Sequence, residues 1–439
     1  EIDVPIVADI HFKPDAAMEA VKWVEKVRVN PGNYADKKRF AVIEYTDEEY
    51  AAELQRIDEE FTPLVLEAKK RGVGMRIGTN HGSLSDRIMN RFGDTPRGMV
   101  ESALEFARIA RKHDYHQFVF SMKASNPKVM IEAYRLLVAR LYEEGNDWNY
   151  PIHLGVTEAG DGEDGRIKSA IGIGSLLADG VGDTIRVSLT EDAIYEIPVA
   201  RTLVDIIRET RTVGQDLSDE LGWEDVSWNP FEYERRHSSK IEVQGIAVGG
   251  AETIRVFTSR EKWNALAHKL DQMGEFQPEV IIDDAQVISI DPRDEDAVAE
   301  INAQIEPQMI TVKDGLELNV ISAFRLLAAR VDARHPILLK DVLYPSDDSE
   351  KDFLPTLLTA SMNIGALLCD GIGDAVLVQG EQAPGQSLRL SYNILQAAGA
   401  RIFKTDYVAC PSCGRTLFNL QTTTQKIREA TGHLKGVRI

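Results

Sequence analysis

Strand-length apolar runs alternate with longer helix-period segments through the first half of this 439-residue chain. Strand and helix in regular alternation are typical of right-handed βα units on a parallel sheet. Six such units end near residue 212, so we predict an α/β fold, a (β/α)8 TIM barrel lacking its first two βα units. An open doubly wound sheet is the rival arrangement. The strand candidates are PIVADIHF (5–12), KVRVNPGN (26–33), VGMRIGTNHG (73–82), FVFSMKAS (118–125), IHLGVTEAG (152–160) and DTIRVSLTED (183–192).

The second half of the chain repeats the first in degenerate form. Residues 133–140, AYRLLVAR, recur as AFRLLAAR at 323–330. Residues 173–187 recur at 364–378 with nine of fifteen positions identical. The nearly equal offsets of 190 and 191 residues make these matches one long repeat. We therefore expect a second, degenerate TIM-barrel-like domain.

The positions that differ between the two copies indicate where the chemistry lies. Arg186 of the first copy becomes Leu377 in the second, whereas Lys123 is matched by Lys313. We expect the active chemistry in the first copy and interpret the second as a structural spacer. The predicted domains are a catalytic barrel incomplete at its N-terminus (1–212), a barrel-like insertion (213–399) and the beginning of a small α/β domain (400–439).

Composition excludes several classes of protein. Hydrophobic residues make up 43% and charged residues 27% of the chain, which excludes a disordered chain. The net charge of −20 argues against nucleic acid and anionic membranes as partners, and no stretch approaches the roughly 18 to 20 apolar residues of a membrane helix. Three cysteines suit a reducing compartment. Because the chain begins inside a strand without Met, signal or transit peptide, we expect a fragment and favour a bacterial cytoplasm.

Basic residues occupy matching positions in four predicted strands of the first copy. Each precedes a small residue by two positions, and positions i and i+2 of a strand face the same way. The carboxyl ends of barrel strands form the active-site mouth, where four cations repel one another unless an anion lies among them. A diphosphate suits guanidinium forks, and the alternative is four separate salt bridges. The pairs are Arg28 with Asn30, Arg76 with Gly78, Lys123 with Ser125 and Arg186 with Ser188, and Asn80 continues the face of Arg76.

Other polar residues at strand ends have a functional and a structural interpretation. Asp9 and His11 share one face, where they position a substrate hydroxyl, pass a proton or form a structural pair. Glu158 is a candidate general acid or a solvated loop residue, and His153 is interpreted as a core histidine. A Gly-rich turn suited to close approach of phosphate contains Asn80, His81 and Ser83.

Cys410 and Cys413 form a CxxC motif that places two thiolates on one metal, and Gly414 allows a tight turn after it. A zinc ribbon needs a second CxxC, which the sequence lacks. Two thiolates are too few for most clusters, so we expect a further ligand beyond Ile439. Cys369, within an apolar run, is interpreted as a core residue.

Taken together, these motifs resemble the 4-hydroxy-3-methylbut-2-enyl diphosphate synthase family of the non-mevalonate (MEP) isoprenoid pathway. The long second copy is similar to the three-domain form of that family, in which the insertion is a second, degenerate barrel. The matching runs are VADIHF (7–12), VRVNPGN (27–33), MRIGTNHGSLSDRI (75–88), SMKASNP (121–127), HLGVTEAG (153–160), IRVSLTED (185–192) and ACPSCGRTLF (409–418).

The resemblance implies an oxidoreductase with a 4Fe–4S cluster. It would convert 2-C-methyl-D-erythritol 2,4-cyclodiphosphate to 4-hydroxy-3-methylbut-2-enyl diphosphate by two-electron ring opening and loss of water, with ferredoxin or flavodoxin as donor. Cys410 and Cys413 would be two of three cysteine ligands, and the open iron site would take a substrate oxygen. The reacting carbons would face Asp9, His11, Asn30 and Glu158, with Glu158 favoured for proton delivery. The diphosphate would be held by Arg28, Arg76, Asn80, Lys123, Arg186 and Ser188.

Two departures from the family pattern shape these expectations. The first two βα units would precede Glu1, and a third cysteine and a glutamate would follow Ile439, so we expect the printed chain alone to hold no stable cluster. A homodimer and a plastid source stay open. Two alternatives also stay open: a phosphate-binding lyase or aldolase with Lys123 as Schiff-base nucleophile and zinc at the CxxC, and an inactive diphosphate-binding remnant.

Overall fold

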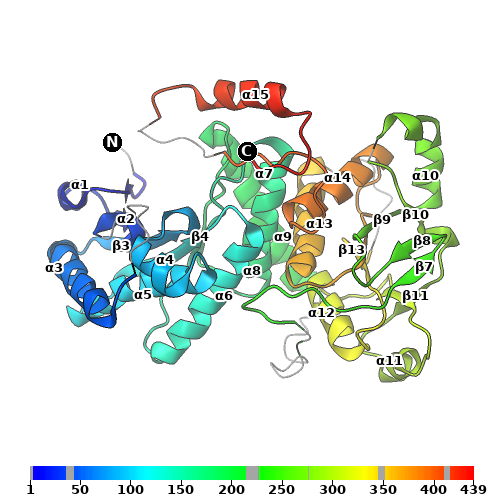
Figure 1. Ribbon diagram of the computed structural model, residues 1–439, viewed down its shortest axis with the longest axis horizontal. Helices are drawn as coiled ribbons and strands as arrows, with labels where there is room; N and C mark the ends of the chain where they lie inside the picture. Colours follow the sequence, from blue (N-terminus) through cyan, green and yellow to red (C-terminus); the bar gives the residue numbers. More distant parts are fainter. Residues whose placement is uncertain are drawn as a thin grey trace. The chain divides into compact units, whose positions relative to one another are not determined.

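The computed structural model describes residues 3–35, 44–213, 226, 228–274, 276–344, 352–409 and 416–439 (Figure 1). Contacts within the chain divide it into two compact units. The first unit contains Glu1–Ser125, Val129–Thr157 and Val181–Arg186, and the second contains Asn126–Lys128, Glu158–Gly180 and Val187–Ile439. The domain boundaries predicted from the repeat stay a prediction.

The first unit contains six strands of the first repeat, paired in parallel and in chain order. Strands β1 to β4 form one sheet, and an isolated bridge between Phe120 and Ile152 joins β4 to the pair β5 and β6. Sequential parallel pairing is what the alternating sequence predicts. The strands are β1 (Val7–Ile10), β2 (Lys26–Val29), β3 (Gly74–Asn80), β4 (Phe118–Lys123), β5 (His153–Leu154) and β6 (Thr184–Ile185).

The last two strands are shorter than the sequence predicts. Strands of nine and ten residues were expected at 152–160 and 183–192, but β5 and β6 contain two residues each. The ladder ends early because Thr157 donates its backbone N–H to Ala124, in the loop beyond β4. The chain then turns, and Glu158 adopts a positive φ of 55°.

Helices connect these strands, and their ends carry the expected signals. The longest, α3, begins at a capping box in which Thr46 and Glu49 satisfy each other's backbone N–H groups, and it ends at Gly72 with φ 67°. The helices of the first repeat are α1 (Pro14–Ala20), α2 (Pro31–Tyr34), α3 (Asp47–Arg71), η1 (His81–Ser83), α4 (Asp86–Phe92), α5 (Pro96–Lys112), α6 (Pro127–Glu144), α7 (Gly162–Ser169), η2 (Ala170–Gly174), α8 (Ser175–Ala178), η3 (Ala193–Tyr195) and α9 (Glu196–Val213).

The second repeat, within the second unit, pairs its parallel strands so that the last of them, β14, lies beside the first, β9. Strand β14 pairs with β9, and a bridge between Ile310 and Ile337 joins β12 to β13. The pairing order is β11-β12-β13-β14-β9-β10, and an antiparallel hairpin of β7 and β8 packs against the apolar interior. The strands are β7 (Ile241–Val243), β8 (Ile246–Val248), β9 (Arg255–Thr258), β10 (Val280–Ile281), β11 (Val287–Ile290), β12 (Met309–Val312), β13 (Leu338–Lys340) and β14 (Ala375–Leu377).

Helices of the two repeats pack on each other reciprocally within the second unit. A Cβ added to Gly174 would lie 2.7 Å from Met362, and one added to Gly365 would lie 2.4 Å from Ile171. In the repeat, offset by 191 residues, Gly365 corresponds to Gly174 and Met362 to Ile171. Such exchange of equivalent contacts is the mark of pseudo-two-fold packing and supports the repeat independently of sequence identity. The remaining helices of the second repeat are α10 (Arg260–Leu266), η5 (Ala267–Gln272), η6 (Ile282–Asp284), α11 (Glu295–Asn302), α12 (Val320–Arg330), α13 (Phe353–Cys369) and α14 (Pro384–Ala397).

The end of the chain forms a small βα arrangement. A parallel bridge joins Asp406 to Arg438, and Val408 donates its N–H to Ile439. Helix α15 (Leu420–Thr431) lies between these two segments along the chain. None of the helices in the described ranges is long and apolar enough to cross a lipid bilayer.

Candidate active site

The first unit places charged residues side by side on the inner face of its sheet. The register pairs Asp9 of β1 with Arg28 of β2, and Arg28 with Arg76 of β3. One strand further, Asn80 at the end of β3 pairs with Lys123 at the end of β4. The strand ladder thus brings together five of the residues that the spacing of the sequence singled out.

Arg28 is the centre of this group. Its guanidinium donates to the Asp9 carboxylate at 2.8 Å, to the Gly78 carbonyl at 2.7 Å and to Asn80 Oδ1 at 3.3 Å. His11 lies 3.2 Å from the same guanidinium and 3.6 Å from Asp9. With 3% of its surface exposed, Arg28 is fixed by these contacts in one orientation.

The cations outnumber the carboxylates that neutralise them. In the described part of the chain, Asp9 is the one carboxylate within 4 Å of any of Arg28, Arg76 and Lys123, and it lies 3.9 Å from Arg76. Arg76 and Lys123 are 9% and 7% exposed. Buried cations without counter-ions are costly, so this group is suited to an anion.

Perturbed pKa values follow from the same arrangement. Burial, followed by the neighbouring Arg76 and Arg186, lowers the pKa of Lys123 well below its usual range. Burial and Arg28 lower the pKa of Arg76 to about 10. Burial alone would raise the pKa of Asp9, but the hydrogen bond from His11 and the charge of Arg28 outweigh it and hold that pKa below its usual range.

Lys123 lies over the backbone of β5. A Cβ added to Gly155 would lie 2.9 Å from Lys123 Cε and 3.0 Å from Lys123 Nζ. Gly155 therefore leaves the space that the lysine side chain occupies. The spacing of the basic residues did not single out Gly155, although a glycine directly after a strand often marks the close approach of another group.

A cavity of about 230 Å³ opens inside the strands of the first unit. His153, interpreted from sequence as a core residue, lies on its wall with Nδ1 2.8 Å from the Thr184 hydroxyl. Burial, then the charge of Lys123, lowers the pKa of His153 to about 2, so the ring is neutral. Arg186, predicted to bind phosphate, is exposed and lines the same cavity. The lining is Val7, Asp9, Lys26, Arg76, Val119, His153, Thr184 and Arg186.

The loops after β2 and β3 interlock beside the cations. Asn30, which is fully buried, donates through Nδ2 to the Ser83 hydroxyl at 2.8 Å and accepts from the Gly32 N–H. A Cβ on Gly32 would lie 1.8 Å from the Ser83 carbonyl oxygen, so only glycine fits there. His81, in the same turn, lies 3.2 Å from Asp94. Sequence reasoning named Asn30 and Ser83 separately and missed Gly32, which locks their loops together.

Two further predicted residues belong to the second unit. Ser188 follows β6 and is 5% exposed. Glu158 is exposed, at the positive φ already noted. Their proposed roles toward substrate stay predictions.

The cysteines divide into one buried residue and two outside the described ranges. Cys369 lies in α13 and is 7% exposed, as expected for a core residue. Cys410 and Cys413 lie outside the described residues. Among the described residues, no three His, Cys, Asp or Glu side chains gather as a metal site.

Comparison with known proteins agrees with this geometry. The GcpE TIM-barrel domain family matches residues 1–201. A 4-hydroxy-3-methylbut-2-en-1-yl diphosphate synthase (flavodoxin) from Akkermansia muciniphila is 57% identical over 436 residues, which are 99% of this chain and 74% of that protein. The chain belongs to the 4-hydroxy-3-methylbut-2-en-1-yl diphosphate synthase family.

Other members of the synthase family match over similar lengths. The protein of that name from Leptospira interrogans is 43% identical, over 99% of this chain and 76% of its own length. A chloroplastic relative from Arabidopsis thaliana, named as the ferredoxin form, is 40% identical over all of this chain and 69% of its own length. The TIM-barrel assignment predicted from the alternating sequence is therefore confirmed at family level.

Proposed function

We propose that this protein is an oxidoreductase that converts 2-C-methyl-D-erythritol 2,4-cyclodiphosphate to 4-hydroxy-3-methylbut-2-enyl diphosphate in non-mevalonate isoprenoid biosynthesis. The observation that carries the proposal is the group of buried cations on β2, β3 and β4, for which Asp9 is the one carboxylate within 4 Å among the described residues. A diphosphate supplies the negative charge that this group lacks. The printed names of the relatives specify the synthase reaction.

The site residues predicted from the sequence divide into binding and reacting roles. Arg28, Arg76 and Lys123 bind the diphosphate, with Asn80 at the end of the same ladder. Arg186 and Ser188 complete the binding set after β6. Asp9 and His11, which contact Arg28, face the reacting carbons with Asn30. Glu158 delivers the proton that accompanies loss of water.

When bound, a 4Fe–4S cluster would pass to the substrate the two electrons that the donor provides for the reduction. The donor set of this chain fits it in part, because two thiolates separated by two residues are the ligands that iron–sulfur clusters prefer. Cys410 and Cys413 would be those ligands. The segment before them is held in place, since Thr190 donates its hydroxyl to the Ala409 carbonyl at 3.0 Å.

The electron donor is flavodoxin or ferredoxin, the two donors that the names of the relatives specify. We place the reaction in the bacterial cytoplasm or, in a plant, in the plastid stroma. The names of the relatives support the choice of donor. The acidic, cysteine-poor composition of the chain supports the choice of compartment.

Anaerobic loading of the full-length protein with iron and sulfide tests the proposal. Cys410→Ser should abolish the broad visible absorption and the acid-labile sulfide. Cys369→Ser is the matched control, because it removes a cysteine that the fold buries, and it should leave both unchanged. Zinc bound at the motif, or a cluster that survives Cys410→Ser, would overturn the cluster assignment.

A further inference from the structure

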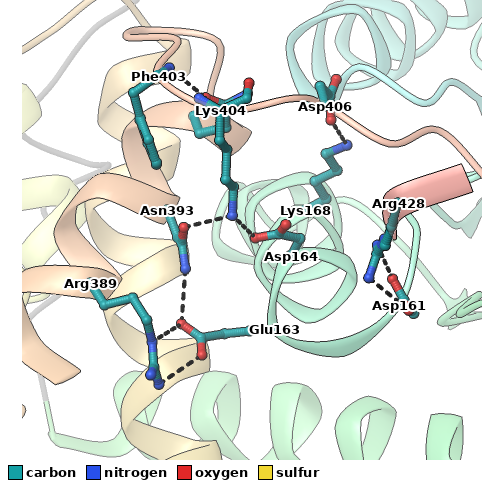
Figure 2. Close-up of polar contacts among 11 residues, drawn as sticks. Asp161, Glu163, Asp164, Lys168, Arg389, Asn393, Phe403, Lys404, Asp406 and Arg428 are labelled. Carbon is teal, nitrogen blue, oxygen red and sulfur yellow. Dashed lines mark hydrogen bonds and ion pairs between the residues drawn. The ribbon is translucent and has the colours of Figure 1, made fainter. Parts of the chain in front are cut away.

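Helix α7 and the extended segment that leads into Cys410 carry charges that meet in pairs (Figure 2). Lys404 donates to Asp164 at 2.7 Å, and Lys168 donates to Asp406 at 2.6 Å. The two pairs have opposite polarity: the helix supplies the anion in the first and the cation in the second. Both lie within the second unit.

The second pair is the more buried one. The Lys168 side chain is 7% exposed and that of Asp406 is 20% exposed. Burial would raise the pKa of Asp406, but Lys168 and then Arg438 outweigh it and lower that pKa. Lys404 also donates to Asn393 Oδ1 at 2.8 Å, so this ammonium has two fixed acceptors.

The spacing of the charges matches on the two elements. Asp164 and Lys168 are four residues apart on α7, so they lie on one face about 6 Å apart along the helix. Lys404 and Asp406 are two residues apart in extended chain, which is about 6.6 Å. Four helical residues therefore span nearly the same distance as two extended residues, and both pairs form at once.

Alternating polarity makes this match specific for one register. If the segment slid by two residues in one direction, Lys404 would face Lys168. In the other direction, Asp406 would face Asp164. Either shift replaces an attraction with a repulsion between like charges. The two pairs therefore favour one position of the segment along α7 over the positions two residues away.

The selected position fixes the chain as far as Ala409, the last described residue before the CxxC motif. Ala409 is held by Thr190 in the loop after β6. A Cβ on Gly160, in the loop that contains Glu158, would lie 3.3 Å from the Tyr407 carbonyl oxygen. Arg428 of α15 binds Asp161 at the start of α7 through both of its terminal nitrogens (Figure 2).

We propose that Asp164, Lys168, Lys404 and Asp406 form a charge register that fixes residues 404–409, the segment before the CxxC motif, against the loops after β5 and β6. They are positioning residues, because they act on the site through the backbone that they hold. The consequence for turnover rests on the proposed function, but the register itself does not.

Chemical labelling of lysine amines in the iron-free protein tests the register. Exchanging the two residues of the segment, in K404D/D406K, keeps composition and net charge but sets like charges against each other at both contacts. Labelling of Lys168 should then rise about tenfold. The exchange across one pair, in D164K/K404D, keeps both contacts attractive. The labelling of Lys168 should then stay within about twofold of its wild-type value. Lys426→Glu, on the exposed part of α15, is the charge-change control and should also leave Lys168 protected.

Each outcome decides the proposal. Protection of Lys168 that persists in K404D/D406K with native circular dichroism overturns it, as does equal labelling of Lys168 in both exchange variants. If K404D/D406K fails to fold, Lys404→Asp alone carries the same expectation with an increase of about threefold. In loaded enzyme, K404D/D406K should lower kcat with KM for the cyclic diphosphate unchanged. Should the reductase proposal fail, the labelling result still stands.

Discussion

The interiors of the two repeats are built on the same parallel ladder and filled in opposite ways. In the first repeat, the inner face of β1 to β4 presents Asp9, Arg28, Arg76 and Lys123, of which Asp9 and Arg76 line a cavity. In the second, the strands enclose an apolar core that includes Phe257, Met309, Leu338 and Leu377. Leu377 is the repeat equivalent of Arg186. At this position, a side chain that lines the cavity in the first repeat is replaced by one that packs in the core of the second.

Buried charged side chains of the second repeat find their partners within that repeat. Lys340 donates to Asp314 at 2.6 Å, and Lys262 donates to the Val378 and Glu381 carbonyls and to the Ser387 hydroxyl. Asp341, fully buried, accepts the N–H groups of Gln379 and Gly380. A barrel interior is therefore completed either by its own side chains or, as in the first repeat, by a ligand of opposite charge.

The largest expected effect is on turnover. Lys123→Met removes a buried cation that has no carboxylate partner in the described part of the chain, so kcat/KM for the cyclic diphosphate should fall at least about 10³-fold, or about 4 kcal/mol. The free energy of unfolding of the ligand-free protein should stay equal or rise. Lys340→Met, which removes a paired lysine from the second repeat, should lower stability and leave kcat/KM within about twofold. Activity retained in Lys123→Met would contradict the claim that the interior of the first repeat, unlike that of the second, is completed by the substrate anion.

Gly32→Ala tests whether the loops beside the cations depend on their interlock. The new Cβ would overlap the Ser83 carbonyl, so the free energy of unfolding should fall by about 3 kcal/mol and diphosphate binding should weaken. Gly82→Ala is the matched control, since no atom lies within 4 Å of its added Cβ, and its change should be within about 0.5 kcal/mol. Denaturant unfolding of both variants measures the difference; equal values would refute the interlock.

Lys262→Met should affect stability alone. It leaves the buried Glu381 carbonyl without its lysine donor, while the Val378 carbonyl keeps the Ser387 hydroxyl, so the free energy of unfolding should fall by about 1 kcal/mol. Because these contacts lie inside the second repeat, kcat/KM should be unchanged. A loss of turnover at wild-type stability would instead assign the second repeat a part in the chemistry.

The smallest effect is a difference in pH dependence between Asp341, which is fully buried, and Asp9, which is more exposed. Burial raises the pKa of Asp341 from 3.8 to about 6, so its cost to folding is absent at low pH and appears as pH rises through that range. The lowered pKa of Asp9 gives stability above its unfolded pKa that is lost as pH falls below that value. Asp341→Asn should therefore remove a loss of stability between about pH 4 and 6, and Asp9→Asn should remove a gain that lies below about pH 4. Thermal melting from about pH 2 to 6 measures both, and slopes of the same sign would contradict the assignment.

Sequence reasoning reached the inner face because alternation along a strand is local. Knowing that Arg28 and Asn30 share a face needs only their spacing, and the ladder then aligns Arg28 with Arg76. The pairing of β14 with β9 in the second repeat, and the contact of Gly32 with Ser83, depend on chain segments far apart. No spacing rule predicts such contacts.

One inference from the repeat needs correction. Lys313 was matched to Lys123, which suggested that the second copy kept this cation. The strand β12 ends at Val312, and Lys313 is exposed in the turn that follows, whereas Lys123 is still in β4 and buried. Identity in the alignment therefore did not preserve the environment of the side chain. The buried lysines of the second repeat, Lys262 and Lys340, have no counterpart in that alignment.

Calorimetric titration of inorganic diphosphate into the iron-free protein tests the central claim most directly, because it measures the anion site without any redox step. We expect one binding site per chain, weakened at least tenfold by Arg76→Met, equivalent to about 1.4 kcal/mol, and unchanged by Lys340→Met. Affinity that falls equally in both variants, or in neither, would contradict the claim that the first repeat is completed by a diphosphate and the second by its own side chains.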